Sequence, residues 1–251
     1  MIDITTFKIT TVTKKDYYSK FEFSPLPKGY GHSLGVPLRR VLLSSLEGSA
    51  ITEVKIDGVK QEYGTMPGIK EDVLKIIFNF KKVVFQANTT TKKSHTVHLV
   101  AKGQKKLTAG DIKTDGEVEV VNPDQEICEL TANSAKFEAE ITVESGVGYR
   151  LADNDIRTKI GLLPVDAIFS PIDRVKYEVV NTRVGQETEL DKLVLELWTR
   201  TKDSAEECLH KASKLLFAAY SSTVAQTGGL DELEEKKSVK KSVKKVNAKR
   251  K

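Results

Sequence analysis

The stretch GYGHSLGVPLRRVLLSSLEG, residues 29–48, predicts an amphipathic helix that begins close to Pro37 and ends at Gly48. Proline is tolerated in a first helical turn, because the backbone donor that it lacks has no partner there in any helix. The apolar residues recur at the spacing of one helical face and are Leu34, Leu38, Val41, Leu42 and Leu46. This face is expected to pack on a hydrophobic core.

The opposite side of the same helix carries Arg40, Leu43 and Glu47, if each residue turns the helix by about 100°. Arginine beside an exposed apolar side chain is typical of the centre of a protein–protein interface. A solvated arginine next to a stray exposed leucine is the alternative, and it occurs on any surface. The pattern alone leaves both interpretations open.

Strand-like alternation flanks this helix on both sides. Before it, Phe7 and Ile9 and then Phe21 and Phe23 alternate with polar residues. After it, residues 83–149 consist of short strand-like pieces separated by turn residues, among them VVFQA, HTVHLV, GEVEVV and KFEAEITV. The middle of the chain is therefore expected to be mostly β.

Three further elements complete the expected order. Asp57-Gly58 is the strongest short hairpin signal, and a second amphipathic helix is expected from about Lys70 to Phe80. Two strands, DRVKYEVVNTRVG and ELDKLVLELWT, are joined by Gly185-Gln186-Glu187. Strands and helices in this order predict an α+β fold.

The last helix is expected to start near Ser204, which forms a capping box with Glu207, and to continue to about Gln226. Alanine recurs every seven residues, and LLFAAY at 215–220 is apolar throughout. A helix that is apolar over so wide an arc needs cover on two sides, which favours dimerisation. A helix fully buried within its own chain is the alternative.

Composition excludes several classes of protein. The 251 residues are 39% apolar and 30% charged, which is typical of a folded chain, and no signal peptide or run of about eighteen apolar residues is present. We therefore expect a cytoplasmic protein without a membrane span. The two cysteines and four histidines are scattered, and His95 and His98 fall on opposite faces of a strand, so neither a disulfide, a metal site nor a cofactor is expected.

The net charge of +5 belongs entirely to the end of the chain. Residues 231–251 contain nine Lys or Arg and four Asp or Glu, which leaves 31 basic and 31 acidic residues in positions 1–230. Any electrostatic attraction to nucleic acid is therefore expected from this tail, which is too polar to fold alone and is expected to be disordered.

Four collinear segments carry a resemblance to a known family. Residues 29–48 resemble the signature of the bacterial RNA polymerase alpha subunit, a Gly-x-Gly-His-Ser/Thr-Leu-Gly turn that leads into a helix with Leu-Arg-Arg and Leu-Leu-Ser-Ser. The other three segments agree with that family in order and spacing and are ITEVKIDGVKQEYGTMPGIKEDVLKII, VDAIFSPIDRVKYEV and ELDKLVLEL.

The resemblance implies a non-catalytic scaffold that dimerises and binds two larger polymerase subunits. Its dimerisation domain would comprise residues 1–48 and 174–230, with a mostly β domain inserted at 49–173. The positions that match the family's contacts to the beta and beta-prime subunits are Arg40, Leu43, Lys81 and Val165. The homodimer would form through the first and last helices, with Leu38, Leu42, Leu209, Ala212, Leu216 and Ala219 as the expected contact residues.

The sequence departs from that family in two places. Val36-Pro37 replaces the small pair, such as Asn-Ala, that is usual at this point of the first helix. The chain also stops where family members continue into a helical domain that binds DNA, and KKSVKKSVKKV follows instead. One hypothesis is that Lys240, Lys241, Lys244 and Lys245 contact promoter DNA phosphates. The other is that the tail only aids solubility or is vestigial.

Two rival functions remain from the sequence. A free-standing dimeric DNA-binding protein would use the basic tail without polymerase partners. An enzyme has little support, because Gly29, Gly31 and Gly35 are not followed by the Lys-Ser/Thr of a phosphate-binding loop and no catalytic triad spacing is evident.

Overall fold

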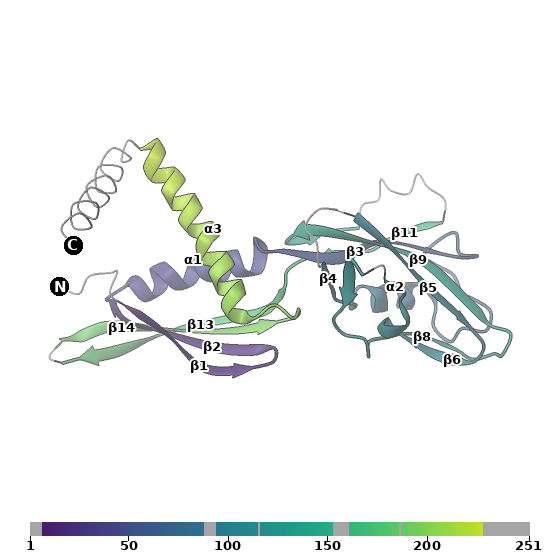
Figure 1. The fold of residues 1–251 in the computed structure, drawn as a ribbon, viewed down its shortest axis with the longest axis horizontal. Helices are drawn as coiled ribbons and strands as arrows, with labels where there is room; N and C mark the ends of the chain where they lie inside the picture. Colours follow the sequence, from purple (N-terminus) through teal and green to yellow (C-terminus); the bar gives the residue numbers. More distant parts are fainter. Residues whose placement is uncertain (1–6, 88–93, 115, 153–160, 186, 228–251) are drawn as a thin grey trace, which may run out of the picture.

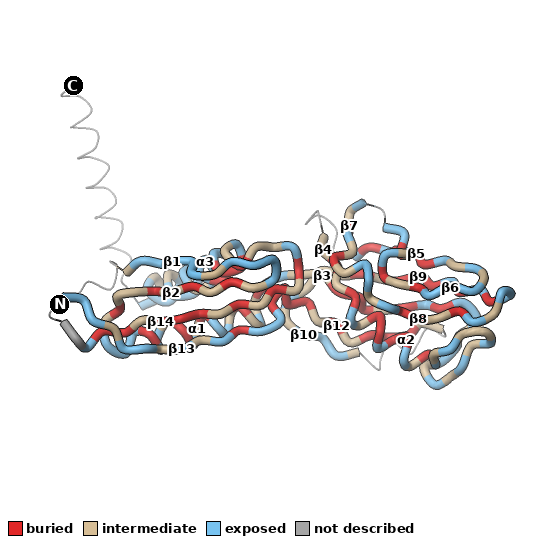
Figure 2. Tube along the Cα trace, turned by 90° about the horizontal axis from the view of Figure 1, so that it is seen from below, coloured by how far each residue is buried: buried red, intermediate tan, exposed pale blue. Residues whose placement is uncertain are grey.

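The computed structural model describes residues 7–87, 94–114, 116–152, 161–185 and 187–227. It is an elongated molecule with two lobes (Figure 1). Buried segments run through both lobes, and each lobe has a hydrophobic cluster of its own (Figure 2). The chain passes between the lobes at the start of strand β3 (Glu47–Ile56) and again before strand β13 (Ile172–Val184) (Figure 1).

The first lobe is an antiparallel sheet with two helices on one face (Figure 1). The strand order is β1 (Lys8–Lys15), β2 (Tyr18–Pro27), β14 (Glu187–Thr199) and β13 (Ile172–Val184). Helices α1 (Tyr30–Ser44) and α3 (Ala205–Gln226) cross on that face. The apolar residues between sheet and helices include Phe21, Phe23, Leu38, Leu42, Leu193, Leu195, Leu197, Cys208, Leu209 and Ala212.

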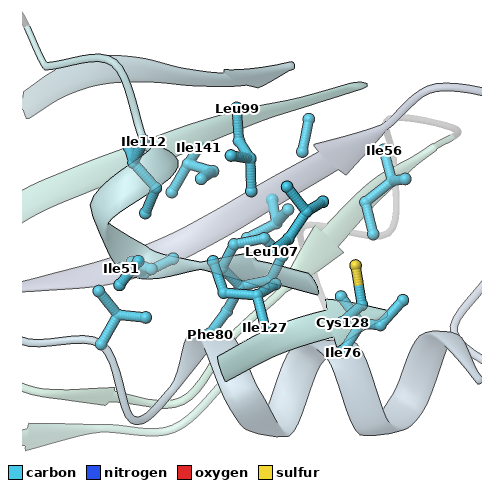
Figure 3. Close-up of a cluster of buried hydrophobic side chains, with 14 of the residues drawn as sticks. Ile51, Ile56, Ile76, Phe80, Leu99, Leu107, Ile112, Ile127, Cys128 and Ile141 are labelled. Carbon is cyan, nitrogen blue, oxygen red and sulfur yellow. The ribbon is translucent and has the colours of Figure 1, made fainter. Parts of the chain in front are cut away.

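The second lobe contains the segment between the two crossings. Its main sheet has the order β5-β9-β3-β4-β7, with β11 also paired to β3. The elements are β3 (Glu47–Ile56), α2 (Val73–Phe80), β4 (Phe85–Ala87), β5 (Ser94–Lys102), β6 (Lys105–Thr108), a 3-10 turn (Ala109–Asp111), β7 (Val118–Val120), β8 (Glu126–Leu130), β9 (Lys136–Val147), β10 (Tyr149–Arg150), β11 (Leu162–Pro164) and β12 (Ala167–Ile168). Side chains from α2 meet those of the strands in a closely packed core (Figure 3).

Most of the predicted elements are confirmed, including the α+β class. Helix α3 starts after Ser204, whose side chain accepts the Glu207 N–H while the Glu207 side chain accepts the Ser204 N–H. Helix α2 begins at Val73 because Asp72 caps it, slightly later than the predicted Lys70. Strands β13 and β14 form the predicted antiparallel hairpin.

Both predicted ends of the first helix were wrong. Helix α1 begins at Tyr30, well before Pro37, where the distant Asp191 carboxylate accepts the Gly29 and Gly31 N–H groups. It ends at Ser44, because Glu47 already pairs with Val147 in the sheet. Gly48 is not a helix terminator but a point of close approach, since a Cβ there would collide with the carbonyl oxygen of Phe169.

The hairpin predicted at Asp57-Gly58 was also wrong. The turn itself exists, with Gly58 at a φ of 78° and the Val59 N–H bonded to the Ile56 carbonyl at 3.1 Å. However, β3 pairs with β9 and with no strand that directly follows the turn. Pairing between distant segments outweighed the local turn signal.

Candidate docking and dimerisation surfaces

A carboxylate from the far end of the chain holds the start of helix α1. The helix has Gly29 at its N-cap, so no local side chain can accept its first amide protons. Asp191 on β14 takes this role, since its Oδ2 accepts the Gly29 N–H at 2.8 Å and the Gly31 N–H at 3.1 Å. Asp191 is only 6% exposed, so the bonds lie in a shielded environment.

Two glycines allow helix α1 to lie directly on the sheet. A Cβ added to Gly31 would come within 2.6 Å of a Val179 methyl carbon, and one added to Gly35 within 2.8 Å of the Tyr177 ring. Both contacts are closer than carbon atoms tolerate, so any larger residue at these two positions would force the sheet side chains to shift. The glycine spacing in the signature segment therefore has a packing explanation.

The outward face of α1 is partly as predicted. Arg40 is exposed and has no ion-pair partner among the residues that the structure describes. Leu43, however, is half-buried and packs against the core of the first lobe, so it does not project fully from the helix. The assumed turn of 100° per residue placed Leu43 opposite the core face, whereas the side chain packs against the cluster that the sheet and both helices form.

The structure brings Lys81 and Val165 together at one end of the second lobe. Lys81 Nζ lies 2.8 Å from Asp166 Oδ2 and 5.5 Å from the centre of the Tyr149 ring. The hydrogen bond with Asp166 raises the pKa of Lys81 and lowers that of Asp166. Val165 itself is buried, and its N–H bonds to the Thr52 carbonyl. Asp166 and Tyr149 were not predicted as site residues.

The six residues predicted to form the dimer contact divide into two groups. Four of them are buried in the lobe's own core and leave little surface for a second chain: Leu38, Leu42, Leu209 and Ala212. Leu216 is half-buried against the same core, and Ala219 is exposed. The four buried residues therefore pack the helices onto their own sheet.

The second half of α3 presents a different, uncovered set of apolar side chains. It extends away from the sheet (Figure 1), and Phe217 and Tyr220 are 73% and 59% exposed. Val224 and Leu215 are also exposed. Phe217, Tyr220 and Val224 are three and seven residues apart, which places them on one side of the helix. Large apolar side chains clustered in this way mark an interaction surface.

The predicted DNA-binding lysines, Lys240, Lys241, Lys244 and Lys245, lie outside the described residues, as does the whole segment 231–251. Among the helices that the structure describes, none has the length and apolarity needed to cross a membrane. Within the same residues no three His, Cys, Asp or Glu side chains gather as metal ligands.

Comparison with known proteins decides the family. A DNA-directed RNA polymerase subunit alpha from Roseiflexus sp. (strain RS-1) is 42% identical over 225 residues, which are 90% of this chain and 69% of that protein. The chain belongs to the bacterial RNA polymerase alpha subunit family. Other members include the alpha subunit of Symbiobacterium thermophilum, 44% identical over 93% of this chain and 75% of that protein. The alpha subunit of Thermus aquaticus is 44% identical over 82% of this chain and 66% of that protein.

The second lobe has a family match of its own. Residues 54–170 match the RNA polymerase Rpb3/RpoA insert domain, and this range runs from β3 to just before β13. Alpha subunits are components of DNA-directed RNA polymerase, the nucleotidyltransferase complex of transcription. The surfaces on α1, on α3 and around Lys81 are therefore those of a polymerase subunit.

Proposed function

We propose that the chain is a non-catalytic assembly subunit of the cytoplasmic polymerase, which dimerises and then binds the beta and beta-prime subunits. The uncovered apolar side of α3, around Phe217 and Tyr220, is the observation that carries this proposal. A side chain of that size gains about 1.5–3 kcal/mol when it is removed from water. A second copy of the chain offers the same apolar side, as an isologous two-fold interface requires.

In this proposal the two lobes have different tasks. Residues 1–48 and 174–230 form the dimerisation domain, and residues 49–173 form the inserted domain. Exposed Arg40 on α1 contacts the beta subunit, with half-buried Leu43 beside it. Lys81 and Asp166 form the contact to the beta-prime subunit, while buried Val165 fixes the backbone beneath them.

Symmetry explains why such a dimer suits assembly. A two-fold dimer presents each docking surface twice, whereas the polymerase needs one copy each of two different large subunits. One protomer would bind beta and the other beta-prime, so the partners break the symmetry. The alpha dimer is then the nucleus of assembly and takes no part in the chemistry.

Co-purification with each large subunit tests this function. The chain, with an affinity tag, is co-expressed with the beta subunit, and the complex is measured by size-exclusion chromatography with light scattering. We expect two copies of the chain for each beta subunit. A chain that remains monomeric, or a dimer that fails to capture beta, would overturn the proposal.

A second function, contact of the basic tail with promoter DNA, is favoured by the location of the net charge. Residues 231–251 account for the whole +5. Deleting residues 236–251 from the assembled polymerase should weaken promoter binding and reduce its dependence on salt concentration. Unchanged promoter affinity across a salt titration would leave the tail without this role.

A further inference from the structure

The first two turns of helix α1 are a poor helix by local sequence. Gly31 and Gly35 each disfavour a helix by about 1 kcal/mol relative to alanine. Pro37 lies inside the helix and has no N–H, so the Ser33 carbonyl receives no bond from it. Residues 30–36 are thus unlike the leucine-rich part that follows, and on local preference alone the helix would begin at Pro37.

Contacts with the sheet hold these residues in a helix instead. Asp191 Oδ2 accepts the two N–H groups of Gly29 and Gly31, as a local capping side chain would. The backbone at Gly31 and Gly35 lies against Val179, Tyr177 and Leu193. Asp191 is the only charged group in this set, and its partners are the amides where the helix begins.

The early start of the helix determines what its outer face presents. Val36 is 51% exposed and lies four residues before Arg40, so in a continuous helix the two side chains are neighbours on one side. Were residues 30–36 not helical, Val36 would leave this side while Arg40 remained. Val36 and Arg40 together have the apolar and cationic composition of an interface centre.

We infer that Val36 is a further docking residue beside Arg40 and that Asp191 is the positioning residue that places it there. The inference rests on the proposed function, because the partner is the large subunit that binds α1, the beta subunit. The partner surface would have an apolar recess for Val36 next to an acidic group for Arg40.

Binding of the purified alpha dimer to the purified beta subunit tests this inference. Val36→Ala should raise the Kd by about three- to tenfold, the loss expected for two methyl groups that are already about half-buried before binding. Alanine is the better helix former, so the same variant should unfold at an unchanged or higher temperature. If Val36 contacts the beta subunit, Val36→Ala weakens binding without lowering the unfolding temperature. If Val36 only supported the fold, the same variant would lose thermal stability as well.

Asp191 is tested by a double-mutant cycle with Val36. Asp191→Ala should weaken beta binding by about tenfold. In the Val36→Ala background it should weaken binding much less, because the valine side chain that Asp191 positions is already absent. Asp191→Asn, which retains an acceptor oxygen, should restore most of the affinity. Hydrogen exchange of the amides of residues 29–34 should increase in Asp191→Ala only.

The control is Glu189→Ala, two positions earlier on the same strand. Glu189 is exposed and pairs only with Lys28 among the residues described, so beta binding should not change. Additive effects of Asp191→Ala and Val36→Ala, or full affinity in Val36→Ala, would overturn the inference while leaving the proposed function in place. If Arg40→Ala also binds beta normally, docking through α1 itself is wrong.

Discussion

The ammonium group of Lys81 donates a hydrogen bond to one carboxylate oxygen of Asp166, at 2.8 Å, while the other oxygen accepts the Ala152 N–H at 2.8 Å. One aspartate therefore links the end of α2 to the chain that follows β10. Both partners of the ion pair retain about a quarter of their side-chain exposure, at 25% and 29%. They are close enough to solvent to meet a partner protein and sheltered enough to remain ordered.

Removing this ion pair should lower stability in a pH-dependent way. Its hydrogen bond lowers the pKa of Asp166, so its stabilisation is complete above the unfolded pKa of about 4 and is lost as the pH falls through the lower folded pKa. The pKa of Lys81 is raised, so the same stabilisation is lost as the pH rises through that value, above about 10.4.

At neutral pH, Asp166→Asn should lower the free energy of unfolding by about 0.5–1 kcal/mol. Urea titrations at several pH values should show this difference vanishing in acid. Glu140→Gln is the control, because the ion pair of Glu140 with Lys55 is long, at 4.0 Å, and largely exposed. A difference between Asp166→Asn and the unaltered chain that stays constant down to pH 2 would contradict the assignment.

Replacing Phe217 with glutamate should dissociate the proposed dimer. The substitution places a charge where the second copy would bury an aromatic ring, and desolvating an unpaired charge costs several kcal/mol. Sedimentation velocity at low micromolar concentration should show monomers that retain the far-UV circular dichroism of the unaltered chain. Ser222→Glu adds the same charge on the opposite side of α3 and should remain dimeric.

Arg40→Ala should weaken binding of the beta subunit by tenfold or more, because arginine at an interface centre commonly contributes more than 1 kcal/mol. Its exposed position means that the melting temperature should not change. Arg39→Ala is the matched control, since Arg39 is also exposed but points about 100° away around the helix. Equal losses from both variants would indicate a general charge effect instead of a specific contact.

Gly48→Ala should destabilise the junction between the lobes. The added Cβ would meet the Phe169 carbonyl oxygen, which belongs to the backbone and has no rotamer by which to move away. We expect a loss of about 2–4 kcal/mol in the free energy of unfolding. Gly64→Ala, where the nearest atom to a new Cβ is 3.9 Å away, should be nearly neutral. Thermal denaturation of both variants checks this.

Sequence patterns predicted best where the local signal and the packing agree. The capping box at Ser204 and Glu207 predicted the start of α3 because both partners lie within four residues. The wide apolar arc of the same helix predicted unburied apolar surface, although the exposed residues are Phe217 and Tyr220 and four of the six residues expected at the contact are in the core.

The failures involve contacts between distant residues. Nothing near Tyr30 reveals that Asp191 will cap the helix there, since the two lie on opposite sides of the inserted lobe in sequence. The Asp57-Gly58 turn is real, but the partner of β3 is β9, which no local pattern identifies. Asp166 was missed because one aspartate between apolar residues has no spacing that distinguishes it.

The hydrogen bond that the Gly29 N–H donates to Asp191 also affects the order in which the nascent chain can fold. These residues are 162 positions apart, and the sheet beneath α1 needs β13 and β14. A ribosome delivers the inserted lobe, from β3 to β12, before either strand emerges, and domains generally fold as units during synthesis. The inserted lobe can thus form its core before Asp191 has been synthesised and can cap helix α1. The proposed docking face of α1 would then acquire its native form only after β14 has left the ribosome, so this helix depends on a strand that is made long after it.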